Sequence, residues 1–247
     1  HLENLANVAG KRKILTLFDC PERVTDFTAQ GAGIYLDYSK QNLTPEELEH
    51  LFKLAQSKEL GTKIQAQFSG QKINNTENRA VLHTVLRAPK AIKQNVLGKD
   101  ADQVIDTESK MKSIVDGVNA GSIVSASGKK FTDILAIGIG GSYYGVKVAL
   151  SALVPFHKGN LKAHVLANVD GDAAQEKLEK LSPDTTLVVI ISKTFTTQET
   201  LLNANVVKQW MLSNSKEQNI ISEQWFAVST NIEAATAFGI DSENILP

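Results

Sequence analysis

The pattern of hydrophobic and polar positions changes near residue 127 and divides the chain into two regions. Before this point, apolar residues recur at spacings of three and four, which indicates amphipathic helices. After it, short and almost continuous apolar runs alternate with helix-like stretches. Strands covered on both faces read as unbroken apolar runs, so this alternation predicts a parallel sheet with crossover helices. We therefore expect a mainly helical region over 1–127 and an α/β domain over 128–247.

The clearest helix start in the first region lies in residues 43–55, "LTPEELEHLFKLA". Thr44 suits the N-cap, Pro45 suits the first helical position, and Glu47 completes a capping box. The preceding residues 30–44 alternate apolar and polar positions and indicate a short hairpin.

Two further helices are predicted from apolar periodicity. One covers 74–89, "NNTENRAVLHTVLRAP", and the other covers 104–118, "VIDTESKMKSIVDGV". His83 would then lie on a helix as a structural histidine, and Glu77 would lie in the first turn, where a carboxylate suits the helix dipole.

Five apolar runs are expected as strands of the sheet, and the first four are each followed by a helix. In such sheets ligands bind beyond the carboxyl ends of the strands, where the direction of winding reverses. The candidate site therefore lies in the residues that follow each strand. The runs are "FTDILAIGIG" (131–140), "KAHVLANVDGD" (162–172), "DTTLVVIISKT" (184–194), "EQWFAVSTN" (223–231) and "NILP" (244–247), and the helices are expected over 143–153, 173–181, 198–211 and 231–238.

The first of these loops, "GIGGSYYG", is rich in glycine but matches neither common nucleotide motif. The dinucleotide pattern needs glycine where Tyr143 stands, and the phosphate-loop pattern needs lysine where Val146 stands. A turn with Ser142 at the start of a helix remains, and free N–H groups at a helix start suit an anion. The alternative is tight strand-to-helix packing with Ser142 as an ordinary N-cap.

The loop "SKTFTT", residues 192–197, places a lysine among hydroxyl side chains directly after an apolar strand. Hydroxyls, backbone N–H groups and Lys193 can converge on a phosphate monoester, whose oxygens accept several hydrogen bonds. The alternative is a helix cap within a threonine-rich turn. Together the two loops predict a small phosphorylated ligand.

The remaining polar residues favour structural roles. Asp170 and Asp172 are expected to form a turn and cap the next helix. His157 and His164 have no evident carboxylate partner in the sequence. No nucleophile elbow, metal triad or paired-carboxylate motif is visible, so no metal site is expected.

Composition limits the classes of partner. The formal net charge of −1 leaves no basic surplus for nucleic acid. No apolar run approaches the roughly 20 residues of a membrane span, and no secretory signal is visible. Cys20 is the single cysteine, which fits a reducing cytosol. The start at His1 and the end just inside an apolar segment suggest a fragment.

Four motifs, in this order and at this spacing, resemble the glucose-6-phosphate isomerase family: "NNTENRAVLHTVLR", "IGIGGSYYG", "SKTFTTQET" and "AVSTN". The segment "ILTLFDCPERVTDFT" resembles the amino-terminal region of that family. Tyr144 and Val146 depart from the Leu and Pro that are usual there. The resemblance implies a three-layer αβα sandwich with a five-stranded parallel sheet of order 2-1-3-4-5, which would place the two loops side by side. By motif matching, the implied sugar-phosphate contacts are Gly141, Ser142, Ser192, Lys193, Thr194, Thr196 and Thr197.

The resemblance also implies a reaction. The family interconverts glucose 6-phosphate and fructose 6-phosphate through an enediolate, without a metal or cofactor, as a cytoplasmic homodimer. Its catalytic glutamate, histidine and lysine are expected beyond Pro247, so no catalytic residue is assigned here and the chain is expected to be inactive alone. The alternative is a non-catalytic sugar-phosphate-binding module of a regulator. The amino-terminal helical region favours the enzyme.

Overall fold

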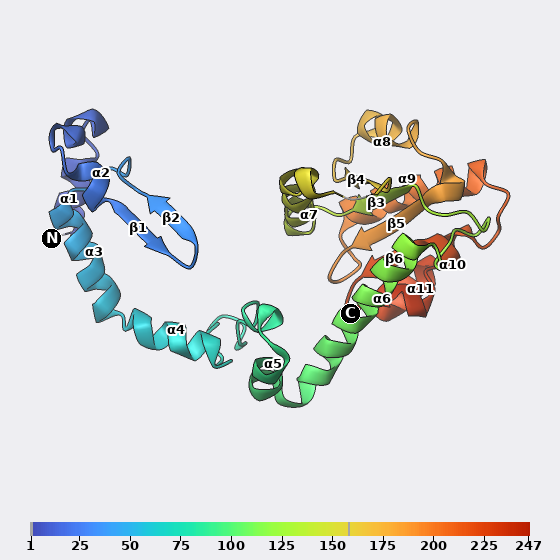
Figure 1. The fold of residues 1–247 in the computed structure, drawn as a ribbon, viewed down its shortest axis with the longest axis horizontal. Coiled ribbons are helices and arrows are strands. Elements are labelled where there is room, and N and C mark those ends of the chain that lie inside the picture. The colour runs from blue at the N-terminus through green and yellow to red at the C-terminus, as the bar shows by residue number, and fades with distance from the viewer. Residues whose placement is uncertain (1, 158) are drawn as a thin grey trace. The chain divides into compact units, whose positions relative to one another are not determined.

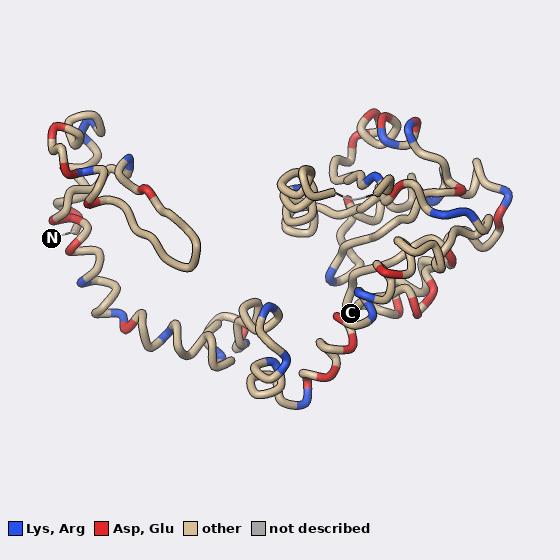
Figure 2. The backbone as a smooth tube through the Cα atoms, viewed as in Figure 1, with Lys and Arg blue, Asp and Glu red and all other residues tan. Residues whose placement is uncertain are grey.

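The computed structural model describes residues 2–157 and 159–247, and the chain divides between Lys99 and Asp100 into two compact units. Figure 1 shows the elements of each unit. Basic and acidic residues occur in both units (Figure 2), and neither unit is restricted to one sign of charge.

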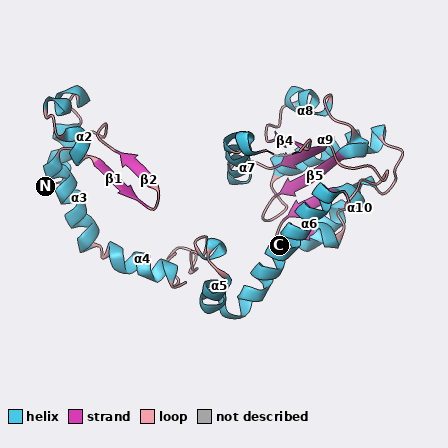
Figure 3. Ribbon diagram, viewed as in Figure 1, coloured by secondary structure: helices cyan, strands magenta, loops and turns pink. Residues whose placement is uncertain are grey.

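The first unit is built mainly from helices, with one small hairpin (Figure 3). The hairpin pairs β1 (Thr28–Gly31) with β2 (Ile34–Asp37), which confirms the predicted hairpin but places it at 28–37 instead of 30–44. Its helical elements are α1 (Leu2–Ala9), η1 (Ile14–Asp19), α2 (Arg23–Asp26), α3 (Pro45–Ser57), α4 (Leu60–Phe68), η2 (Val85–Arg87) and α5 (Lys90–Leu97), and the short η3 (Gly98–Asp100) spans the division between the units.

The start of α3 follows the sequence prediction. The Glu47 backbone N–H donates to the Thr44 hydroxyl, and the Thr44 N–H donates to the Glu47 carboxylate at 2.7 Å, which completes the capping box. Arg12 adds two bonds to the same carboxylate, at 2.8 and 2.5 Å. Glu47 therefore both caps α3 and forms a partly buried ion pair with Arg12, which follows α1 in the chain.

The predicted helix over 74–89 is wrong. The Asn74 N–H instead donates to the Arg79 carbonyl and the Arg79 N–H donates to the Asn74 carbonyl, which closes a tight loop, and Asn78 adopts a left-handed φ of 52°. A left-handed residue interrupts a right-handed helix. Only η2 is helical in this stretch, so His83 lies in a turn and not on a helix.

The second unit holds the α/β fold. Its helix α6 (Ala101–Ala120) confirms the prediction for 104–118 and ends at Gly121, which adopts the left-handed conformation that glycine tolerates at a helix end. The expected boundary at 127/128 lies within this unit, after α6, and remains a proposal for where the α/β domain itself begins. The other elements are β3 (Asp133–Ile137), α7 (Gly141–Ala152), η4 (Val154–Phe156), β4 (Lys162–Leu166), α8 (Gly171–Leu178), η5 (Pro183–Thr185), β5 (Thr186–Ile191), α9 (Gln198–Asn214), α10 (Ile220–Gln224), β6 (Trp225–Val228), α11 (Ile232–Phe238), η6 (Ser242–Asn244) and β7 (Ile245–Leu246).

The sheet is parallel and its order is β4-β3-β5-β6-β7. Numbered within the sheet, this is 2-1-3-4-5, as predicted. The chain leaves β3 toward β4 in one direction and winds back through β5, β6 and β7 in the other. The winding therefore reverses between β3 and β5, and this is the point where such sheets bind ligands.

Side chains on the two sheet faces form two hydrophobic clusters, which give the three layers. Helices α8 to α11 cover one face of the sheet, and α6 packs against the other. Alternation along each strand sends neighbouring residues to opposite faces, as for Leu187 and Val188 in β5. The central strands β3 and β5 are therefore mainly apolar, whereas the edge strand β4 carries Lys162 and His164 and is more exposed.

Candidate functional site

The two predicted loops meet at the switch point. Ile137 of β3 pairs with Ile190 of β5, so Gly138 and Ile191 lie side by side at the carboxyl ends of these strands. A Cβ atom on Gly138 would stand 3.2 Å from the Ile191 carbonyl oxygen and 3.1 Å from both the Cβ and the carbonyl oxygen of Ser142. A side chain at 138 would therefore crowd Ser142 and the Ile191 carbonyl, so glycine suits this position.

The glycine-rich turn exposes backbone donors and does not use Ser142 as a cap. Gly140 is the N-cap of α7, with φ of 58°, and makes no side-chain capping bond. Ser142 lies in the first turn, half-buried, and its N–H donates to the Ile139 carbonyl at 3.1 Å. The reading of Ser142 as an ordinary N-cap is therefore wrong. The N–H groups of Gly140 and Gly141 find no partner among the described residues.

The second loop carries an enclosed hydroxyl without a partner. Ser192 is 4% exposed, and its Oγ makes no hydrogen bond within the described residues. An enclosed polar group without a partner costs about 1–3 kcal/mol. The Thr194 and Thr196 hydroxyls bond to each other at 2.7 Å, and Thr197 is the N-cap of α9 without a side-chain capping bond. The capping alternative for this loop thus lacks the bond that would define it.

Phe195 anchors the same loop in the core. It is 3% exposed, and its ring lies 5.8 Å from that of Phe238 in α11, centroid to centroid. Its φ of 53° is left-handed, which costs a residue with a side chain about 1–2 kcal/mol. This conformation buries one side chain of the loop and leaves Lys193, Thr194 and Thr196 exposed.

The turn after β6, residues 229–231, donates hydrogen bonds to the loop 192–197. Side chains of Ser229, Thr230 and Asn231 donate to the carbonyl oxygens of Lys193 and Thr194. From the sequence, residues 229–231 ("STN") were expected at this edge of the sheet, but no role was predicted for them. The pattern that could have indicated a role is three consecutive polar residues directly after an apolar strand.

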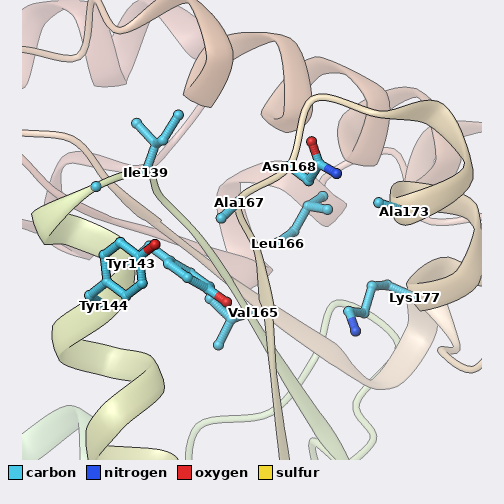
Figure 4. Close-up of a pocket in the computed structure, with 10 residues that line it drawn as sticks. Ile139, Tyr143, Tyr144, Val165, Leu166, Ala167, Asn168, Ala173 and Lys177 are labelled. Carbon is cyan, nitrogen blue, oxygen red and sulfur yellow. The ribbon is translucent and has the colours of Figure 1, made fainter.

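A pocket of about 580 Å³ lies beside this site but does not contain it. Figure 4 shows its walls, with Tyr143 and Tyr144 from α7 on one side and Lys177 from α8 on the other. Of the two predicted loops, only the glycine-rich turn contributes residues to the wall of this pocket, and none of residues 192–197 lines it. The candidate site therefore rests on the loops' backbone geometry and hydroxyls. The lining residues are Ile139, Gly140, Tyr143, Tyr144, Val165, Leu166, Ala167, Asn168, Ala173 and Lys177.

Other polar residues take structural places. The His164 Nε2 lies 2.7 Å from Asp133 Oδ1, at the amino ends of β3 and β4, away from the candidate site. Asp170 caps α8 by accepting from the N–H groups of Asp172 and Ala173, as predicted. Within the described residues, no three His, Cys, Asp or Glu side chains are grouped so that they could hold a metal ion. Nor does any described helix have the length and apolarity to cross a membrane.

Comparison with known proteins gives consistent matches. The family model described as phosphoglucose isomerase matches residues 37–247. The chain is 54% identical to "Glucose-6-phosphate isomerase 2" of Colwellia psychrerythraea, over 100% of this chain and 46% of that protein. It is 45% identical to the glucose-6-phosphate isomerase of Shewanella halifaxensis, over 92% and 42%. A crystal structure of a glucose-6-phosphate isomerase from Chlamydia trachomatis shares the fold, with a TM-score of 0.66 and 24% identity over 85% of this chain and 40% of that one. The chain thus spans somewhat less than half the length of these relatives.

Proposed function

The chain belongs to the phosphoglucose isomerase family, and we propose that it forms the sugar-phosphate-binding part of a glucose-6-phosphate isomerase. The family match runs through most of both compact units. The reaction proposed for the whole enzyme is the reversible conversion of glucose 6-phosphate to fructose 6-phosphate through an enediolate, without a cofactor. A cytoplasmic homodimer is proposed on the same ground.

The proposed role of the two loops is to hold the phosphate group. A phosphate monoester carries three oxygens that accept hydrogen bonds from N–H groups and hydroxyls. The pairing of β3 with β5 carries this proposal, because the two loops follow neighbouring strands and Gly138 lies close to the Ile191 carbonyl at the end of β5. The proposed contacts are Gly141, Ser142, Ser192, Lys193, Thr194, Thr196 and Thr197.

Backbone and hydroxyl groups are proposed to matter more than Lys193. A hydrogen bond to a charged group contributes ~1.5–3 kcal/mol, whereas an exposed ion pair contributes ~1 kcal/mol or less. Lys193 is exposed, and no ion pair joins it to another described residue. An enclosed hydroxyl such as that of Ser192 gains a partner when a ligand oxygen reaches it.

No catalytic residue is proposed within this chain. The carbon-bound proton has to be moved by a positioned base, which typically contributes ~10²–10⁴-fold, and the family's glutamate, histidine and lysine have no match among the motifs here. We propose that they belong to the remainder of the enzyme. The match of the family model to residues 37–127, as well as to the α/β domain, favours an isomerase over a regulator's isolated binding module.

Titration of the 247-residue chain with glucose 6-phosphate by calorimetry tests the proposal. We expect binding that weakens ~10-fold or more in Thr197→Val, which removes one hydroxyl and keeps the shape of the side chain. Thr236→Val, an exposed threonine on α11, is the matched control and should bind as the unmodified chain does. A coupled assay should detect no isomerase turnover. Equal affinity in Thr197→Val and the unmodified chain would show that the Thr197 hydroxyl does not contact the phosphate.

A further inference from the structure

The proposed phosphate loop, residues 192–197, accepts hydrogen bonds from residues 229–231, which form the turn between β6 and α11. Three groups of this turn donate to the Lys193 carbonyl oxygen: the Thr230 N–H at 3.0 Å, the Thr230 hydroxyl at 2.8 Å and the Ser229 hydroxyl at 3.1 Å. A carbonyl oxygen has two lone pairs. Three donors around one oxygen therefore fix the direction of this peptide group more firmly than a single bond would.

Fixing the Lys193 carbonyl also fixes the N–H group that follows it. In a planar trans peptide the C=O and the next N–H point in opposite directions. Because the Lys193 carbonyl points at the 229–231 turn, the Thr194 N–H points away from that turn. No partner for this N–H occurs among the described residues. It is a free donor of the kind that successive backbone N–H groups offer to anions.

Asn231 makes a second connection. Its Nδ2 donates to the Thr194 carbonyl at 3.0 Å, while its Oδ1 accepts from the Ala234 N–H at 3.1 Å and caps α11. One side chain thus joins the loop to the start of the helix. Phe195 reaches the end of the same helix through Phe238, so α11 holds the loop by polar and apolar contacts together.

We propose that Thr230 and Asn231 are positioning residues of the phosphate loop. They hold the peptide groups of Lys193 and Thr194 so that the free N–H of Thr194 faces the bound anion. The proposal rests on the proposed function of this loop. Neither side chain has to touch the ligand, since each acts through a carbonyl of the loop.

Two variants separate positioning from folding. Thr230→Val keeps the size of the side chain and the backbone donor but loses the hydroxyl bond to Lys193. Asn231→Ser keeps a good N-cap side chain for α11 but loses the amide that bonds the Thr194 carbonyl. Thr236→Val is the control. Thr236 lies on α11, and its hydroxyl makes no hydrogen bond within the described residues.

The experiment is a titration of the isotopically labelled 247-residue chain with inorganic phosphate, followed by the amide resonances of 138–142 and 192–197. Loss of one neutral hydrogen bond corresponds to about a threefold to tenfold change in an equilibrium. We therefore expect phosphate to bind about threefold to tenfold more weakly to Thr230→Val and Asn231→Ser and unchanged to Thr236→Val. Without phosphate, the Thr194 amide resonance should already move in the first two variants, while their thermal unfolding midpoints stay near that of the unmodified chain.

The failures of the two proposals are distinguishable. If Thr230→Val and Asn231→Ser retain full phosphate affinity while Thr197→Val loses it, the positioning role is overturned and the proposed phosphate site stands. If phosphate moves no amide of either loop in the unmodified chain, the phosphate site is overturned, and the positioning role falls with it.

Discussion

At the scale of single residues, the sequence indicates which side chains are candidates for the site but not how the backbone presents them. The hydroxyls of 192–197 and the glycines of 138–141 are visible as a pattern after apolar strands. The left-handed φ of Phe195 is not visible in the sequence, because phenylalanine has no intrinsic preference for it. In the fold it occurs together with the buried contact between Phe195 and Phe238. The pairing of His164 with Asp133 was likewise hidden, since it depends on the neighbouring strands β3 and β4.

Gly138 gives the sharpest prediction at this scale. An added methyl in Gly138→Ala would stand 3.1–3.2 Å from backbone and side-chain atoms of Ser142 and from the Ile191 carbonyl oxygen. Most of these atoms are backbone, so the loops have to move apart. Forcing extra atoms into a packed site typically costs ~1–3 kcal/mol. We expect Gly138→Ala to lower the urea midpoint of the second unit and to weaken phosphate binding.

Gly145→Ala is the matched control for this experiment. Gly145 lies within α7, and a Cβ there meets nothing within 4 Å. Replacing a helix-interior glycine by alanine stabilises by roughly 0.5–1 kcal/mol. Both tryptophans, Trp210 and Trp225, belong to the second unit, so their fluorescence follows its unfolding. Equal midpoints for the two variants would contradict the close approach at Gly138.

At the scale of elements, the sequence succeeded where one strong signal had no local competitor. The strands of the α/β unit and α3, with its capping box, follow the predicted pattern. The prediction for 74–89 failed because the backbone bridge between Asn74 and Arg79 and the left-handed φ of Asn78 interrupt a helix despite the apolar periodicity. Periodicity predicts which face can be buried, and it does not count these local bonds.

The cap of α3 makes the first unit sensitive to acid. Hydrogen bonds from Arg12, followed by the Thr44 backbone bond and the Arg12 charge, lower the pKa of Glu47 from 4.5 to about 2, against the opposing effect of burial. A lowered folded-state pKa stabilises the fold above the unfolded value and loses that contribution as the pH falls. The first unit should therefore lose stability between about pH 5 and pH 2.

Glu47→Gln isolates this contribution. Glutamine at this position still completes a capping box but gives up the charge that Arg12 contacts, a loss of roughly 1–3 kcal/mol at neutral pH. Hydrogen exchange of the α3 amides should show faster opening in the variant at pH 6 and a shrinking difference as the pH approaches 2. A difference that persists unchanged at pH 2 would assign the stability to packing of the side chain and not to its charge.

At the scale of the whole molecule, the topology explains why the predicted strands of the α/β unit were enough to indicate a candidate site. Parallel order 2-1-3-4-5 leaves one reversal of winding, and the loops after β3 and β5 are the two that border it. The sequence could not predict which surfaces the second unit leaves uncovered. Its helix α7 has no buried residue, and a pocket of about 550 Å³ beside it is lined mainly by apolar side chains.

This apolar surface makes a prediction for the 247-residue chain in solution. Val154 and Phe156 are 67% and 73% exposed and line that pocket together with Leu150, Leu153 and Leu161. Contiguous exposed apolar patches favour association, and the chain spans less than half the length of its relatives, so we expect it to self-associate at micromolar concentration and to bind a hydrophobic dye. The double variant Val154→Ser/Phe156→Ser should reduce both effects. Leu15→Ser, which removes a side chain that is 82% exposed in the other unit, should leave them unchanged. The prediction is contradicted if the unmodified chain sediments as a monomer and binds no dye, because these apolar side chains would then not be accessible in solution.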